Sequence, residues 1–481
     1  MAARDDVFKA VLINPPRLHP VRFDHPNFKY ADSLLLVYPP LGLMYLAQAL
    51  RQKIPGVRVT LIDCVAERLD ADQAARRAAD MEPDVVGLSA LTHYFYDAWQ
   101  TARAVKKAKA DAVVVVGGPH MYALGRESMA HDCFDYGVVG EGEEVFADLC
   151  RALWDKAEVK LVPGLLRRAG GEVQGGGAAM VKDLDRIGVP AVDLQSFSPY
   201  VGLKRLRLGF VGFRAVVSTS RGCPFRCAFC QIPEDHYRLR GIPNIIEEIE
   251  LYVQKGVRNF IFCDHLFNIN KNRVIDFCEA VLAKKLEIKW SFQGRIDQID
   301  DPLMRLARKA GCDALYVGIE DCTDAGLRAI KKHLTMQQVY DGLRAVMRNG
   351  INCTTNWIIG FPRHQCAQDV ERLIDTAFGT KSIPNFQLLQ CMPGTELHEQ
   401  AVAEGGIDPL YWTNYVRNPR AEFSPPIWER HFTKNELYAL YFQAVRRLPL
   451  KACKYFVQIA FWRAWSMIIY RFGALRRRGN R

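Results

Sequence analysis

The folds open to this chain of 481 residues are limited most by two separate series of short apolar runs. Each run is followed by an amphipathic stretch. Alternation of this kind is typical of parallel sheets with helices between consecutive strands. The first series predicts strands at residues 9–13, 57–62, 85–88, 113–116 and 136–139. The second predicts strands at residues 215–219, 259–263, 288–293, 314–319, 354–359 and 385–389. The sequence therefore predicts an α/β protein, and at this length we expect two or three domains.

These patterns divide the chain into four predicted regions. Residues 1–155 form a first α/β domain, and residues 156–212 form a connector in which glycine pairs indicate a hairpin. Residues 213–395 carry the second series, whose six βα units predict a partial (β/α)6 barrel. Residues 396–481 are predicted to be mainly helical and end in a basic tail rich in aromatic residues.

Three cysteines follow the first strand of the second series, in Ser-Thr-Ser-Arg-Gly-Cys-Pro-Phe-Arg-Cys-Ala-Phe-Cys. Cys223, Cys227 and Cys230 have CxxxCxxC spacing, which supplies three thiolates where a complete protein shell around an iron–sulfur cubane needs four. The fourth iron then stays open to a small chelating ligand. The alternative is a zinc knuckle or three buried cysteines. Zinc knuckles usually show two CxxC pairs or nearby Cys/His partners, and the only nearby histidine is His236.

This motif resembles that of the radical S-adenosylmethionine (SAM) superfamily, whose cluster binds SAM through its amino and carboxylate groups. The resemblance continues at successive strand ends and implies a set of SAM-binding residues. In the family's order, Phe229 meets the adenine through its backbone, and Asp264 stands in the segment that contacts the amino group. His265 departs from the family pattern, which often repeats the acid there. The implied set is Phe229, Asp264, Gln293, Arg295, Gly318, Glu320, Ile359 and Gly360.

Three of these positions have more specific implied roles. Arg295, which ends the third strand of the barrel, would bind the SAM carboxylate bidentately. Glu320 matches the ribose motif and would accept a hydrogen bond from a ribose hydroxyl. Gly360 lies in a later adenine segment, after which residues 363–365 (Arg-His-Gln) depart from the usual Gly-Glu-Thr.

The strand ends of the first series carry small and polar residues, and glycine pairs there allow close approach of a bulky ligand. Their ordered set resembles the cobalamin-binding domain that precedes many radical SAM domains. It lacks the DxHxxG motif whose histidine ligates cobalt in other cobalamin domains. The alternative is a domain that has lost cobalamin and remains as a scaffold. The resemblance implies cobalamin contacts by Asn14, Pro15, Ser89, Leu91, Thr92, Gly117, Gly118, Pro119, His120, Gly140, Glu141 and Gly142.

Together the resemblances imply a Rossmann-like cobalamin-binding domain, a partial (β/α)6 radical SAM barrel and a helical C-terminal region. The implied cofactors are a 4Fe-4S cluster, SAM and cobalamin, and the implied enzyme is a C-methyltransferase. It would methylate an unactivated carbon of a natural product, a tetrapyrrole or a lipid-like molecule. Because the cofactors carry the chemistry, no protein acid, base or nucleophile is assigned. The alternatives are an oxidative cyclase or ring-rearranging enzyme without methyl transfer, and a sensor that binds without turnover.

The net charge of +11 comes from the C-terminal tail. Ten Lys and Arg and no acidic residue follow position 436, and the rest of the chain has 54 basic and 53 acidic residues, so no nucleic-acid partner is expected. An apolar run within residues 451–471 is shorter than the roughly 20 residues of a membrane span. It predicts peripheral membrane contact or a helix packed on the barrel.

Fourteen cysteines without a visible targeting peptide indicate a reducing, cytoplasmic location. The resemblance also implies an electron donor such as flavodoxin or ferredoxin.

Overall fold

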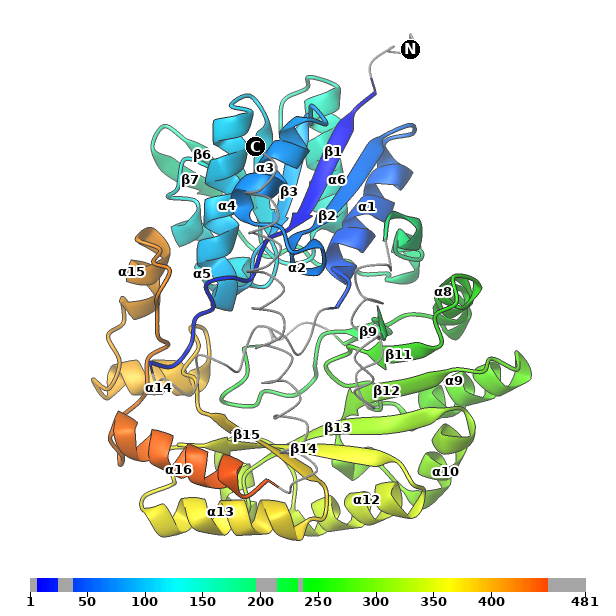
Figure 1. The fold of residues 1–481 in the computed structure, drawn as a ribbon, viewed down its shortest axis with the longest axis vertical. Helices are drawn as coiled ribbons and strands as arrows, with labels where there is room; N and C mark the ends of the chain where they lie inside the picture. The colour runs from blue at the N-terminus through cyan, green and yellow to red at the C-terminus, as the bar shows by residue number, and fades with distance from the viewer. Residues whose placement is uncertain (1–6, 25–37, 196–213, 232–236, 449–481) are drawn as a thin grey trace, which may run out of the picture.

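The computed structural model describes residues 7–24, 38–195, 214–231 and 237–448 and consists of two α/β domains stacked on each other (Figure 1). Residues that follow strands of one sheet contact residues that follow strands of the other. His93, after the third strand, bonds to Gln390, after the last, and Glu143 pairs with Arg221 near the cysteine loop. The loops that carry the predicted cofactor residues therefore meet between the domains.

The first sheet begins with five parallel strands, which confirms the predicted α/β class. Its order is β2-β1-β3-β4-β5-β6-β7. The five parallel strands are β1 (Lys9–Asn14), β2 (Arg58–Asp63), β3 (Val85–Ser89), β4 (Val113–Gly117) and β5 (Tyr136–Val138). The helices are α1 (Leu41–Lys53), α2 (Cys64–Glu67), α3 (Ala71–Ala79), α4 (Phe95–Ala108), α5 (His120–Ser128) and α6 (Gly142–Trp154), with a 3-10 turn η2 (Thr92–Tyr94).

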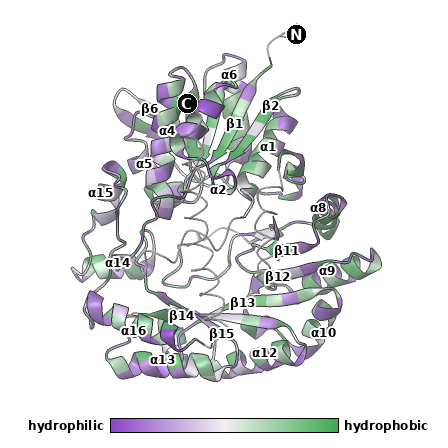
Figure 2. Ribbon diagram, in the orientation of Figure 1, coloured by the Kyte–Doolittle hydropathy of each residue, from purple (hydrophilic) through white to green (hydrophobic). Residues whose placement is uncertain are grey.

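Helices cover both faces of this sheet. Helices α1 and α6 pack together, and so do α3 and α4, each pair closing a separate buried apolar cluster against the strands. Figure 2 shows the apolar residues along the central strands and mixed hydropathy around the outer helices. This is the reason that the strands read as continuous apolar runs in the sequence.

The predicted connector adds two strands to the first sheet. Strand β6 (Leu165–Ala169) pairs antiparallel with β5 and forms a hairpin with β7 (Glu172–Gly175). Gly170 and Gly171 close the hairpin with φ angles of 60° and 84°, in the left-handed region that favours glycine. The first sheet thus continues beyond residue 155. Two 3-10 turns follow, η3 (Asp185–Ile187) and η4 (Val192–Leu194).

The second sheet contains six parallel strands in the order β8-β11-β12-β13-β14-β15, as expected for a partial barrel. These strands are β8 (Ala215–Val217), β11 (Asn259–Phe262), β12 (Lys289–Gly294), β13 (Cys312–Glu320), β14 (Asn352–Ile359) and β15 (Ile383–Leu388). Helices α8 (Ile242–Gln254), α9 (Lys271–Ala283), α10 (Asp301–Lys309), α11 (Asp324–Ala329), α12 (Met336–Arg348) and α13 (Ala367–Gly379) accompany them, with a 3-10 turn η6 (Ile296–Gln298). The short strands β9 (Ser220–Arg221) and β10 (Arg238–Leu239) pair beside the cysteine loop.

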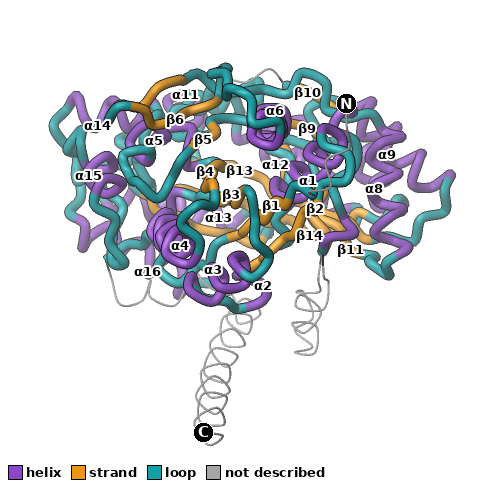
Figure 3. The backbone as a smooth tube through the Cα atoms, turned by 90° about the horizontal axis from the view of Figure 1, so that it is seen from above, coloured by secondary structure: helices purple, strands orange, loops and turns teal. Residues whose placement is uncertain are grey.

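The C-terminal region contacts both domains. Its helices are α14 (Glu396–Ala403), α15 (Tyr411–Arg417) and α16 (Lys434–Arg446). Helix α16 packs on β14, β15 and α13, whereas α15 packs on α5 of the first domain. Seen from above, α14 and α15 lie at the opposite end of the molecule from α8 and α9 (Figure 3).

No helix among the described residues is long and apolar enough to cross a membrane. The predicted basic tail from residue 451 onward lies outside the described residues.

The junction between α15 and the first domain depends on aromatic packing. Tyr415 is fully buried, stacks on Phe423 at 3.8 Å between ring centroids and lies edge-on to Phe95 at 6.4 Å. We expect Tyr415→Ala to lower the free energy of unfolding by about 3 to 5 kcal/mol, because it leaves an aromatic-sized cavity. Tyr415→Phe, which keeps the ring, is the control. Urea unfolding of both variants measures the effect, and an equal loss of stability in both would contradict this account.

Candidate functional site

The three predicted cluster ligands lie together on the loop after β9. Cys223, Cys227 and Cys230 form no disulfide, and each is partly exposed. Burial raises the pKa of Cys223 and Cys227, and the positive charges of Lys332 and Arg295 act in the opposite direction. Iron is ligated by the thiolate form, and the two cations offset part of the effect of burial. The donor set therefore fits a cluster with three protein ligands.

Among the described residues, no three His, Cys, Asp or Glu side chains converge as ligands of a single metal ion.

Asp264 fixes the strand end from which the cysteine loop departs. Its carboxylate is buried and accepts hydrogen bonds from the backbone N–H groups of Thr219 at 2.6 Å and Ser220 at 3.2 Å, and also from the Thr219 hydroxyl. Arg273 donates to the Thr219 carbonyl at 2.7 Å. Both oxygens of Asp264 are thus used inside the protein, at the segment that the resemblance assigns to the SAM amino group.

Arg295 is also committed within the protein. Its Nε donates to Asp297 Oδ1 at 2.9 Å, and its Nη2 donates to Asp297 Oδ2 at 3.2 Å. Further bonds reach the carbonyls of Lys332 at 3.0 Å and His333 at 2.9 Å, and the guanidinium lies 4.0 Å from the Phe225 ring centroid. The predicted bidentate contact with a SAM carboxylate is not available in this arrangement, because Asp297 occupies the guanidinium.

A buried ion pair beside the cysteines was not foreseen from the sequence. Lys332 Nζ lies 3.2 Å from Glu320 Oε1 and 5.8 Å from the ring centroid of Phe229. Glu320 has a φ of 77° at the end of β13, and burial raises the pKa of its carboxyl while Lys332 opposes the rise. A Cβ at Gly318 would lie 2.0 Å from Glu320 Oε1. A side chain at Gly318 would therefore displace the carboxylate of Glu320 and disturb this ion pair.

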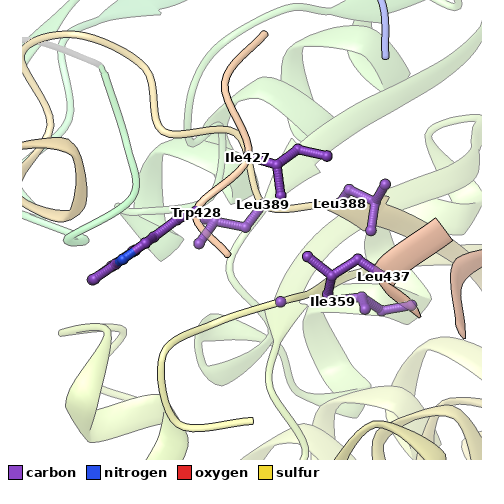
Figure 4. Close-up of a pocket in the computed structure, with 7 residues that line it drawn as sticks. Ile359, Leu388, Leu389, Ile427, Trp428 and Leu437 are labelled. Carbon is purple, nitrogen blue, oxygen red and sulfur yellow. The ribbon is translucent and has the colours of Figure 1, made fainter. Parts of the chain in front are cut away.

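The predicted adenine segment borders a small apolar pocket (Figure 4). Gly360 has a φ of 98° and donates its N–H to His364 Nδ1 at 3.2 Å. His364 Nε2 lies 3.4 Å from Asp321 Oδ2. His364, one of the residues that depart from the family pattern, thus connects the segment after β14 to the end of β13. The pocket is lined by Ile359, Gly360, Leu388, Leu389, Ile427, Trp428 and Leu437.

Gln293 is exposed at the end of β12, where its backbone carbonyl accepts a bond from Phe267. Sequence reasoning placed it at the same strand end as Arg295, and the structure agrees on that position.

The predicted cobalamin residues gather at the carboxyl ends of the first sheet. A Cβ at Gly118, whose φ is 101°, would lie 2.7 Å from the Ala90 carbonyl oxygen, so only glycine allows β3 and β4 to end this close together. Asn14 donates its side-chain N–H to Asp63 Oδ1 at 2.7 Å. The side-chain oxygen of Asn14 takes no part in that bond. The other predicted residues follow the same strands: Pro15 after β1, Ser89, Leu91 and Thr92 at β3, Gly117 and Pro119 at β4, and Gly140 and Gly142 after β5.

His120 belongs to the core of the first domain. Its ring is completely buried, stacks on Phe95 at 4.3 Å, and has Thr92 Oγ1 at 3.2 Å and Ser128 Oγ at 3.0 Å from its two nitrogens. The His120 side chain is therefore engaged within the domain, and a cobalamin contact at this position stays a prediction. His93 bonds to Gln390, and His236 lies outside the described residues.

The carboxylate of Glu141 is likewise engaged within the protein. Its two oxygens accept hydrogen bonds from Arg238 at 2.8 Å each, and Oε2 also accepts the N–H of Val181 at 2.7 Å. Burial opposes ionisation, but the Arg238 hydrogen bonds and the charge of Arg221 lower the pKa of Glu141. Any cobalamin contact of this segment falls to its backbone, since the carboxylate is turned toward the barrel.

Because burial lowers the pKa of His120 to about 3, the protein binds this proton far less readily than the unfolded chain, where the pKa is about 6.5. Stability therefore rises with pH between these values. We expect the urea midpoint of unfolding to fall as the pH is lowered from about 6.5 to 5. The variant His120→Gln is expected to lose less stability over the same pH interval. Urea unfolding at several pH values measures, for both proteins, the slope of the free energy of unfolding against pH. Parallel slopes would show that His120 is not the titrating group.

Comparison with known proteins agrees with this architecture. Residues 29–150 match the sequence model of the B12 binding domain, and residues 217–377 match that of the radical SAM superfamily. An uncharacterized methyltransferase of Pyrococcus horikoshii is 31% identical over 409 residues, which cover 84% of this chain and 86% of that protein. The anaerobic magnesium-protoporphyrin IX monomethyl ester cyclase of Rubrivivax gelatinosus is 29% identical over 73% of this chain and 64% of the cyclase.

A solved structure supports the fold. The radical SAM methyltransferase TsrM of Kitasatospora setae, with cobalamin and a 4Fe-4S cluster bound, superimposes with a TM-score of 0.66 at 18% identity, covering 84% of this chain and 76% of TsrM. The two matched domains stand in the order that the sequence predicts. The chain therefore belongs to the cobalamin-dependent radical SAM enzymes, whose cofactors are cobalamin, SAM and a 4Fe-4S cluster.

Proposed function

We propose that the protein methylates an unactivated carbon of a small molecule bound between its two sheets. The observation that carries this proposal is the meeting of the B12 domain's strand ends with the cysteine loop of the barrel. The similarity to a methyltransferase over most of both chains supports methyl transfer as the outcome. When bound, the cluster, SAM and cobalamin supply the radical and methyl-transfer chemistry.

The chain's own residues bind and orient these groups in this proposal. Cys223, Cys227 and Cys230 hold the cluster and leave one iron for SAM. Lys332, a cation beside the cysteines, takes the carboxylate role first assigned to Arg295, whose guanidinium is occupied by Asp297.

Glu320, which pairs with Lys332, accepts a hydrogen bond from a ribose hydroxyl, and the segment at Gly360 lies beside the adenine. In the first domain, the small residues Ser89, Gly117 and Gly118 stand at the strand ends that would face cobalamin.

The substrate class and the partners are part of the same proposal. The cyclase relative acts on a tetrapyrrole by its name, and a tetrapyrrole, another natural product or a lipid-like molecule suits this protein. Flavodoxin or ferredoxin would reduce the cluster in the cytoplasm. The basic aromatic tail, which lies outside the described residues, would contact anionic lipid.

Anaerobic reconstitution with iron, sulfide and hydroxocobalamin, followed by product analysis with SAM and a strong reductant, tests this function. We expect about four irons per chain, bound cobalamin, and both 5′-deoxyadenosine and S-adenosylhomocysteine. Cys223→Ala is expected to lose the cluster and both products, whereas Cys366→Ala, which changes an exposed thiol outside the loop, is expected to keep them. Failure to bind cobalamin would contradict the proposal.

The alternative is oxidation or cyclisation without methyl transfer, which the similarity to the Rubrivivax cyclase favours. Bound cobalamin with 5′-deoxyadenosine but no S-adenosylhomocysteine, even with candidate substrates, would support it.

The role of Lys332 has a separate test. We expect Lys332→Met to raise the Kd for SAM by about 10-fold to 100-fold, because it removes a charged hydrogen bond to the carboxylate. Lys331→Met is the matched control, since Lys331 is half exposed and pairs with Glu396 instead. Equilibrium binding of SAM to the reconstituted protein measures both. Equal affinities in the two variants would exclude Lys332 from the SAM site.

A further inference from the structure

We propose that four charged side chains fix the cysteine loop against the first domain and thereby position the cluster relative to cobalamin. They are Arg221, Arg238, Glu141 and Glu143, here called the interdomain ion cluster. The positional claim is independent of which product forms, and its consequence for turnover rests on the proposed function. We assign these residues as positioning residues, because they act through the loop and the strand end that they join.

Arg221 is the part of the ion cluster nearest the cysteines. It lies in β9, two positions before Cys223. Its Nη2 donates to Glu143 Oε1 at 2.6 Å, and its Nη1 lies 3.4 Å from Glu141 Oε2. Charge-assisted bonds of this length are among the strong hydrogen bonds of proteins. A movement of the loop relative to the first domain would therefore have to break them.

Arg238 lies opposite Arg221 in the two-stranded ladder, since β10 pairs with β9 in the register Arg238↔Arg221. It contacts Glu141 bidentately at 2.8 Å for both bonds and also donates to the Val181 carbonyl. A bidentate contact fixes orientation as well as distance. The strands on both sides of the cysteine loop are thus attached to one acidic segment.

The acidic segment is itself held in place. A Cβ at Gly140, whose φ is 92°, would lie 2.3 Å from the Ala179 carbonyl oxygen. The Glu141 N–H donates to the same carbonyl at 2.9 Å. Glu143 lies in the first turn of α6, where a carboxylate is favourable. The glutamates therefore have little freedom to follow a displaced loop.

Tyr45 of α1 adds a second contact between the domains at this place. Its ring centroid lies 5.3 Å from the guanidinium of Arg221 and 5.8 Å from that of Arg240. Arg240 donates to the Tyr45 hydroxyl at 2.8 Å, to the Ser218 carbonyl at 2.7 Å and to Glu248 at 2.5 Å. These bonds of Arg240 hold Tyr45 and the backbone at Ser218 in place next to Arg221.

The four side chains of the interdomain ion cluster are largely buried. The side chains of Arg221 and Arg238 are 18% and 10% exposed, and those of Glu141 and Glu143 are 13% and 6% exposed. Removal of Arg221 takes away the described counter-ion of the buried Glu143 carboxylate. Since a misplacement of about 1 Å between reacting groups can cost about 100-fold in rate, a loosened loop is expected to impair the joint use of the cofactors.

The first test measures the attachment without turnover. Hydrogen exchange is compared by mass spectrometry in reconstituted wild type, Arg221→Gln and Arg214→Gln. Arg214 is the matched control, because it contacts Asp313 bidentately at 3.1 and 2.9 Å with similar burial, entirely within the barrel. We expect Arg221→Gln to raise exchange about tenfold in both residues 214–231 and residues 139–146, the factor implied by losing a charged hydrogen bond. Arg214→Gln is expected to leave residues 139–146 unchanged.

The second test measures the consequence for turnover. With cluster and cobalamin contents matched to wild type, we expect Arg221→Gln to yield about 10-fold less S-adenosylhomocysteine per 5′-deoxyadenosine. Arg221→Lys, which keeps the charge and part of the contact, is expected to recover part of the ratio. Glu143→Gln is expected to resemble Arg221→Gln.

Unchanged exchange at residues 139–146 in Arg221→Gln would overturn the attachment. Raised exchange with an unchanged product ratio would overturn the positioning role. If wild type makes no S-adenosylhomocysteine, the proposed methyl transfer fails, and the exchange experiment still decides whether the ion cluster holds the loop.

Discussion

Charge buried around the first strand of the barrel is the constraint on which the rest of the site depends. Asp264 turns inward to hold the backbone at Thr219 and Ser220, which sets the direction in which the cysteine loop leaves the sheet. Such burial is tolerated only when each charge has a partner. Here cations and carboxylates alternate around the loop: Arg221, Arg238, Arg240 and Arg273 with Glu141, Glu143, Glu248 and Asp264.

The same constraint separates residues that can meet cofactors from residues that hold the scaffold. Arg295 and Glu141 were assigned to cofactors, yet both carry polar groups that the protein already satisfies. Lys332 is different, since its described partner is a single carboxylate beside the cysteines. A charged residue at a strand end is therefore a better site candidate when some of its hydrogen-bonding capacity is left over.

Much of the fold was predictable because burial on both faces of a parallel sheet leaves a direct trace in sequence. The strands of both series appear within a few residues of their predicted positions, and the cysteine loop follows β8 as expected. The hairpin β6–β7 was assigned to the connector because its glycines mark a turn without revealing which sheet it joins. The surroundings of the His120 ring could not be predicted for a similar reason, since a motif gives position along the chain but not the direction of a side chain.

Helix α15 has a consequence for how the chain is made. Tyr415, Trp412 and Phe423 complete an apolar cluster whose other members, such as Phe95 and Leu124, belong to the first domain. During synthesis from the N-terminus, the barrel must emerge before this surface is covered. The nascent first domain therefore carries an uncovered apolar face throughout translation of the barrel, and only the last part of the chain removes it.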